Sequence, residues 1–201
     1  MLFRSGLTLD PSVISPNGDG IADFTVISYS LGVRAAVTAL VTNASGAVVA
    51  TLFTSQLQGA RRQSFPYRAE GLSDGTYLLT VSAVAEDGRT EHATAPFSVD
   101  RTLSALALTT AVLTPNGDGA DDTIGIGFTL AVAADVTVQI EQSGSVVAIV
   151  FAGPLPAGNS QVLWDGTTAT GAAPDGAYDA AVLVEGPFGE TRHAASFTIA
   201  H

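Results

Sequence analysis

The chain has 201 residues, 46% of them hydrophobic, with a formal net charge of −11 and no cysteine. The acidic balance argues against nucleic acid and anionic membranes as partners, because phosphate binding needs clustered Lys and Arg. Since no stretch approaches the roughly 18 consecutive apolar residues of a spanning helix, we expect no membrane insertion. The absence of cysteine excludes disulfides and thiolate metal sites.

One short string occurs twice. Residues Ser15–Asp23 read Ser-Pro-Asn-Gly-Asp-Gly-Ile-Ala-Asp, and residues Thr114–Asp122 read Thr-Pro-Asn-Gly-Asp-Gly-Ala-Asp-Asp. Other segments match at nearly the same offset, as Phe97 does with Phe197. A repeat of about 100 residues is too long for a solenoid unit and suits a self-contained domain. We therefore predict two domains, residues 1–100 and 101–201.

Short runs rich in Val, Thr, Ile and Phe alternate with Gly, Asn, Asp and Pro clusters, and helical periodicity is nearly absent. This pattern is typical of a β-sandwich. The sequence predicts an all-β chain of two tandem immunoglobulin-like, antiparallel β-sandwiches with about seven strands each. The first set of strands is expected at 5–12, 24–31, 35–43, 47–54, 62–68, 76–85 and 90–99. The second set is expected at 103–112, 123–130, 134–142, 145–152, 160–165, 177–185 and 190–199.

The odd strand count has a consequence for the loops. The loops after the first, third and fifth strands should share the end at which the chain leaves each sandwich. The first motif should then lie beside residues 100–102, and the second near the C-terminus. Tyr77 and Tyr178 open the sixth strands, where sandwiches often place a structural tyrosine corner.

Further motifs complete a family pattern in the second repeat, which carries Trp164-Asp165-Gly166 and Pro174-Asp175-Gly176-Ala177-Tyr178. Together with the Pro-Asn-Gly-Asp-Gly string, this pattern resembles the FlgD-like immunoglobulin-type domains found at the C-termini of secreted bacterial proteins. The first repeat departs from it, with Tyr67-Arg68-Ala69 where Trp-Asp-Gly is expected. The resemblance implies an extracytoplasmic accessory domain and names no reaction.

The repeated string also has the donor types of a calcium loop. Calcium takes six to eight oxygen ligands on a sharply turned loop, and the glycines permit such a turn. The candidate metal ligands are Asn17, Asp19, the Ile21 carbonyl and Asp23 in the first copy, and Asn116, Asp118, the Ala120 carbonyl and Asp122 in the second. The distal bidentate Glu of an EF-hand is missing, so water or Asp74, Asp100 and Asp175 would complete the sites.

A plain turn is the alternative interpretation of both loops. Asn-Gly and Asp-Gly are common turn dipeptides, and their side chains can cap backbone N–H groups instead of holding a metal. The recurrence of a final Asp favours calcium, although shared ancestry of the two copies weakens that argument.

Other candidate residues point to structural uses. We expect His92, His193 and His201 to lie on the surface. Trp164 is predicted to be a core aromatic rather than a sugar-stacking platform. No motif of nucleophilic or metal-dependent catalysis is present, and loop carboxylates such as Asp165 have simpler uses than glycoside hydrolysis.

The predicted function is a non-enzymatic, calcium-stabilised structural or spacer module of a larger secreted or cell-surface bacterial protein. Its expected partners are neighbouring domains of that protein. A first alternative is carbohydrate or cell-wall binding, which exposed aromatics among Tyr29, Phe53 and Phe188 would support. A second is self-assembly, which unpaired edge strands would favour. Because Met1–Gly6 lack a signal-peptide core, we expect a fragment or an engineered start.

Overall fold

The computed structural model describes residues 1–201 and consists of strands joined by turns and irregular segments. It has no helix long and apolar enough to cross a membrane. Two compact units are formed, one of Met1–Pro16 with Ala22–Asp100 and one of Asn17–Ile21 with Arg101–His201. The predicted all-β fold class is confirmed, with immunoglobulin-like sandwiches as the architecture.

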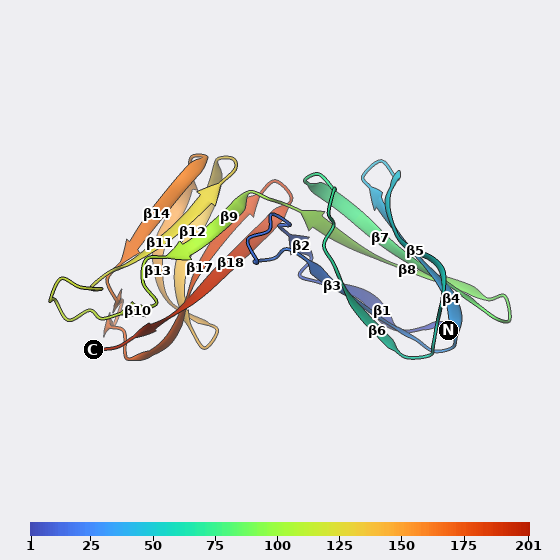
Figure 1. Cartoon of the computed structure of the whole chain (residues 1–201), viewed down its shortest axis with the longest axis horizontal. Coiled ribbons are helices and arrows are strands. Elements are labelled where there is room, and N and C mark those ends of the chain that lie inside the picture. Colours follow the sequence, from blue (N-terminus) through green and yellow to red (C-terminus); the bar gives the residue numbers. More distant parts are fainter. The chain divides into compact units, whose positions relative to one another are not determined.

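The first unit packs a three-stranded sheet against a five-stranded sheet. The first has the strand order β1-β3-β6 and the second the order β2-β8-β7-β4-β5 (Figure 1). The strands are β1 (Phe3–Asp10), β2 (Val13–Ile14), β3 (Thr25–Leu31), β4 (Ala35–Asn43), β5 (Val48–Gln58), β6 (Arg62–Tyr67), β7 (Gly75–Ala85) and β8 (Thr90–Val99).

The second unit repeats this plan with the sheets β14-β11-β9 and β10-β18-β17-β12-β13, and adds the small hairpin β15-β16. Its strands are β9 (Leu103–Leu108), β10 (Val112–Leu113), β11 (Ile124–Leu130), β12 (Ala134–Gln142), β13 (Ser145–Leu155), β14 (Gly158–Trp164), β15 (Thr167–Thr168), β16 (Gly171–Ala172), β17 (Gly176–Gly186) and β18 (Gly189–Ile199). The hairpin occupies the extra residues of the second repeat.

The predicted first strand of each repeat is wrong in one respect. In place of one strand over residues 5–12, the structure has β1 ending at Asp10 and a separate β2 beginning at Val13. It likewise divides residues 103–112 between β9 and the start of β10. β1 and β9 run antiparallel in the three-stranded sheets, whereas β2 and β10 lie parallel to β8 and β18 in the five-stranded sheets. In the first repeat Pro11 falls at the change of sheet, because proline cannot donate a ladder hydrogen bond.

Alternating side chains build the two cores. Along β12, for example, Val136, Val138 and Ile140 are almost fully buried while their neighbours face outward. Burying a large aliphatic side chain contributes about 1.5–3 kcal/mol relative to leaving it exposed. The period of two therefore fixes which face of each strand meets the opposite sheet.

Tyrosine corners close the cores at equivalent places. The hydroxyl of Tyr77 donates to the carbonyl of Ser73 at 2.7 Å, and that of Tyr178 donates to the carbonyl of Pro174 at 2.8 Å. Burial of the Tyr178 ring raises the pKa of its hydroxyl, which favours the neutral donor. The predicted structural role of both tyrosines is therefore confirmed.

Candidate functional site: the motif loops

The two motif loops share one backbone path. In the first copy Gly18, Gly20 and Ala22 have φ values of 85°, 89° and 52°. The equivalent Gly117, Gly119 and Asp121 have φ values of 80°, 90° and 51°. Glycine adopts this left-handed region at little cost, whereas a residue with a β-carbon does so rarely. The repeated glycines therefore permit the same tight loop conformation in both copies.

The final aspartate of the second loop stabilises that loop conformation. Asp122 accepts a 2.7 Å hydrogen bond from the Gly117 N–H through Oδ1 and another of 2.7 Å from the Gly119 N–H through Oδ2. A carboxylate that accepts backbone N–H groups makes stronger bonds than a neutral acceptor does. Asp122 thus links both glycines to the start of β11.

The other two polar side chains of this loop act locally. Asn116 Oδ1 accepts from the Asp118 N–H at 2.9 Å, and Asp118 Oδ1 accepts from the Ala120 N–H at 2.8 Å. The hydroxyl of Thr114 donates to the Ala120 carbonyl at 3.1 Å. Each bond spans a few residues, as in the Asx turns that stabilise loops without a ligand.

The first loop makes the same turns and adds bonds to β9. Asn17 Oδ1 accepts from the Asp19 N–H at 3.0 Å, and Asp19 Oδ1 accepts from the Ile21 N–H at 2.9 Å. Asp19 Oδ2 also accepts from the Ala105 N–H at 3.1 Å. Both residues belong to the second unit, which includes Asn17–Ile21. Both carboxylate oxygens of Asp19 are therefore engaged. Asp23, the last predicted ligand, is buried.

These bonds bear on the predicted metal ligands. No group of three or more Asp, Glu, His or Cys side chains converges on a point in residues 1–201. The side-chain oxygens turn toward N–H groups, and the Ala120 carbonyl accepts from Thr114. Among the suggested additional ligands, Asp175 bonds His201 and Asp100 is fully buried. The capping bonds of the turn interpretation are present, and calcium binding stays a prediction.

One of the three histidine predictions is wrong. His92 and His201 are exposed, whereas the side chain of His193 is fully buried. Residue 193 shares the inward face of β18 with Phe197 and Ile199, since side chains two apart along a strand point the same way. The alternation of β18 could have indicated this burial from the sequence.

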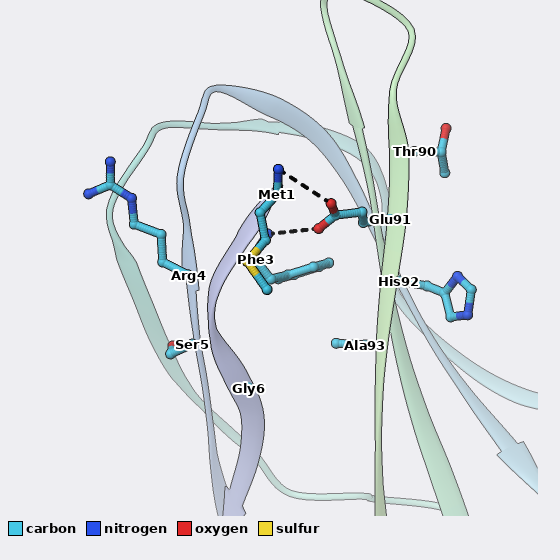
Figure 2. A pocket seen from close by; sticks show the side chains of 9 residues that line it. All are labelled: Met1, Phe3, Arg4, Ser5, Gly6, Thr90, Glu91, His92 and Ala93. Atoms are coloured by element: carbon cyan, nitrogen blue, oxygen red, sulfur yellow. Dashed lines mark hydrogen bonds and ion pairs between the residues drawn. The ribbon is translucent and has the colours of Figure 1, made fainter.

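A shallow cavity of about 430 Å³ lies between the start of β1 and the start of β8 (Figure 2). Glu91 points toward β1 and accepts the N–H groups of Leu2 and Phe3 at 2.6 and 3.1 Å. These bonds, with the one from Phe3 first, lower the pKa of the Glu91 carboxyl. His92 projects from the opposite side of β8, so Glu91 and His92 do not form an acid–base pair.

The aromatic residues that a sugar site would use lie mostly inside. Trp164 is 5% exposed and packs on Tyr178 and Phe197, with ring centroids 6.5 and 6.0 Å away. Tyr29 is buried, and Phe53 and Phe188 are half-buried. Trp164 is therefore a core aromatic, as predicted.

The first unit replaces the Trp-Asp-Gly triplet without losing the aromatic cluster. Tyr67 meets Phe97 edge-on at 6.0 Å, and Tyr77 stacks on Phe97 at 5.5 Å, as Tyr178 stacks on Phe197 in the second unit. Asp165 of the triplet accepts from the Thr167 N–H and hydroxyl, whereas Arg68 lies over the exposed Phe24 ring at 5.5 Å. Tyr67 therefore keeps the core-packing role of Trp164, whereas Arg68 cannot accept the hydrogen bonds that Asp165 accepts.

The motif loop, the buried tryptophan and the tyrosine corner all fall in or beside one segment of the second unit. Residues 110–186 match a family model. The model is that of the FlgD Ig-like domain. The resemblance predicted from the sequence is thereby confirmed for the second repeat. The first repeat has equivalent strands and an equivalent motif loop, so the chain has a tandem plan.

Solved structures resemble the fold of this chain at low sequence identity. The match to a DUF4785 family protein from Legionella pneumophila has a TM-score of 0.53 and 13% identity, and covers 96% of this chain and 55% of that one. A tetra-tandem repeat from the extending region of a large adhesion protein gives a TM-score of 0.38 and 20% identity, over 97% and 48% of the two chains.

Dimeric latent PorU from Porphyromonas gingivalis gives a TM-score of 0.36 and 14% identity, over 98% of this chain and 20% of that one. The chain thus spans between 20% and 55% of the solved chains named here. No curated protein matches the sequence. The similarity to the Legionella protein shows the fold alone.

Proposed function

We propose that the chain is a non-catalytic structural module of a larger secreted or cell-surface bacterial protein, in which its sandwiches space or brace a functional domain. The observation that carries the proposal is the use of the motif side chains. Asn116, Asp118 and Asp122 all accept backbone N–H groups of their own loop. Residues that look like ligands or acid–base groups thereby serve to hold a loop in one conformation.

Other polar and aromatic groups support the same use. The hydroxyls of Tyr77 and Tyr178 close the cores, and the indole N–H of Trp164 donates to the Thr167 carbonyl at 2.8 Å. Buried polar groups that find such partners rigidify a fold. A spacer needs this property, because it must keep its length while its neighbours act.

The extracellular placement rests on the FlgD Ig-like match of residues 110–186 and on what that family resemblance implies. Within this proposal, calcium has a secondary role. Because the loop oxygens already accept N–H bonds, a cation would use their remaining lone pairs and water, and we expect it to add to loops that are already formed.

The experiment compares activity with stability in the Asp122→Ala variant. Wild-type protein should show only background turnover on esterase, protease and glycosidase substrates, and the variant should unfold more easily. Turnover that disappears with a single carboxylate substitution, while the free energy of unfolding stays unchanged, would overturn the proposal.

A further inference from the structure

The edge strands of the sheets differ in the features that protect them from pairing with a further strand. An edge strand exposes unpaired N–H and C=O groups, and proteins block such edges with charges, proline, bulges or very short strands. β2 and β10 have two residues each; β1, β5, β9 and β13 have irregular pairing with their neighbours; and β6 carries Arg62 and Pro66. Each of these edges has at least one such device.

β14 has none of them. It pairs with β11 alone, in unbroken register from Gly158 opposite Leu130 to Trp164 opposite Ile124 (Figure 1). Its sequence, Gly-Asn-Ser-Gln-Val-Leu-Trp, contains neither proline nor a charged residue. The strand therefore presents a regularly paired, seven-residue edge that a further strand can extend.

The chain segment that contains β14 is uncharged up to Asp165, which follows the strand. No charged residue occurs in the sequence between Glu141 and Asp165, although the chain as a whole carries a net charge of −11. Leu163 is 61% exposed on the outer face of the strand. On the same outer face, the exposed side chain of Gln161 leans over β11, since a β-carbon at Gly125 would lie 2.5 Å from Gln161 Nε2.

We propose that the edge of β14 pairs with the β14 edge of a second copy of this chain, in antiparallel orientation about a twofold axis. Two acidic molecules repel each other over most of their surface, and this uncharged edge is where they can approach. A twofold axis makes the contact self-complementary and closed, so that it gives a dimer and no fibre.

The pairing follows from the symmetry. With Gln161 at the centre of the strand, each Gln161 lies opposite its counterpart, and Leu163 of one copy lies opposite Asn159 of the other. Residues directly opposite in an antiparallel pair have β-carbons about 5 Å apart. A charge placed at Gln161 therefore meets the same charge in the dimer, whereas in the monomer it lies on the exposed outer face beside Gly125.

One strand pair buries less surface than the roughly 1,200–2,000 Å² of a stable interface, so the dimer must be weak. Sedimentation velocity from about 10 μM to about 1 mM covers dissociation constants in the micromolar to millimolar range. The weight-average mass of the wild type should rise toward twice the monomer mass. Hydrogen exchange at β14 should slow over the same concentrations.

Gln161→Glu should weaken the dimer at least about fivefold, because like charges lie opposite each other. Gln56→Glu is the matched control: it adds the same charge to the exposed, irregular edge of β5 and should leave dimerisation unchanged. An equimolar mixture of Gln161→Glu and Gln161→Lys should recover the dimer. Unchanged melting temperatures show that the variants fold.

Wild-type protein that stays monomeric at about 1 mM overturns the proposal and leaves the edge to a strand of a different protein. Equal weakening by Gln161→Glu and Gln56→Glu also overturns it, since that result reflects net charge alone. So does a dimer that Gln161→Glu leaves intact, because another surface must then form it.

Discussion

The indole N–H of Trp164 donates a 2.8 Å hydrogen bond to the carbonyl of Thr167, three residues further along the chain. The bond ties the end of β14 to the start of the β15-β16 hairpin while the indole ring packs in the core. A tryptophan used in this way has its face buried and its polar edge satisfied, so that neither is available to stack on a sugar.

Trp164 substitutions separate its two contributions. Trp164→Phe keeps a ring in the core and loses the bond to Thr167, so the free energy of unfolding should fall by about 1–2 kcal/mol. Trp164→Ala also empties the core site and should cost about 3–5 kcal/mol. Chemical unfolding followed by circular dichroism measures both. Equal losses in the two variants would mean that the ring contributes nothing beyond its hydrogen bond.

Asp122→Ala removes the acceptor for two backbone N–H groups, and we expect the second unit to lose about 2 kcal/mol of unfolding free energy. Asp122→Asn keeps one acceptor oxygen and should lose about half as much. Because Trp164 is the single tryptophan, its fluorescence reports unfolding of the second unit. Glu190→Ala, at an exposed carboxylate, is the control and should stay within about 0.5 kcal/mol of the wild type.

Calcium should bind the second loop better than the first. Both oxygens of Asp19 accept hydrogen bonds, whereas Asp118 is bonded to the Ala120 N–H through Oδ1. We expect a dissociation constant of roughly 10⁻³ M, as in weak extracellular modules. At about 10 mM calcium the added stability is then about 1.4 kcal/mol. Calorimetry on chelator-treated protein measures the affinity.

Magnesium at the same ionic strength is the control for calcium, because magnesium gives up its water reluctantly. Asp118→Ala should abolish the calcium-dependent rise in melting temperature, and Asp19→Ala should leave it. Identical melting curves in calcium and magnesium would remove calcium from the function of these loops.

Acid should reveal the bond between Asp165 and Thr167. The Thr167 hydroxyl, and next its N–H, lower the pKa of the Asp165 carboxyl below its ordinary value of about 4. Between the folded and the unfolded pKa of Asp165, the unfolded chain binds more protons than the folded one. The contribution of the ionised carboxylate to stability is therefore complete above about pH 4 and is lost as pH falls through the folded pKa. The stability gap between wild type and Asp165→Asn should therefore narrow toward pH 2.

Denaturant unfolding at several pH values measures that gap. Glu185→Gln, at an exposed carboxylate on β17, is the matched amide control and should differ little from the wild type at each pH. A gap for Asp165→Asn that keeps the same size at pH 7 and pH 3 would show that the carboxylate charge is irrelevant.

Much of the strand plan could be predicted because it depends on a period of two and on turn residues. The predicted strands 35–43 and 134–142 coincide with β4 and β12. The change of sheet between β1 and β2 could not, since it depends on pairing with β8, distant in the sequence. Histidine as a residue type predicts exposure, whereas the inward-facing position of His193 on β18 buries it.

The sequence of the motif loops suits two structures, for a physical reason. The same Asn and Asp oxygens suit calcium and backbone N–H groups, and the spacing that wraps a cation also wraps a turn. Side-chain direction separates the two uses, and it depends on coordinates such as those of Asp122 between Gly117 and Gly119. The position of the glycines was predictable; the partner of each carboxylate was not.

The parallel pairing of β10 with β18 determines how the second unit meets mechanical force. The Thr198 N–H donates to Ala111 and the Ala200 N–H donates to Leu113, both at 3.0 Å. A pull on the chain from both sides draws these parallel strands past each other, so the bonds are loaded together and do not open one by one. β2 and β8 repeat the arrangement through Ser98 and Asp100. We therefore expect each sandwich to resist stretching through its short parallel strand pair.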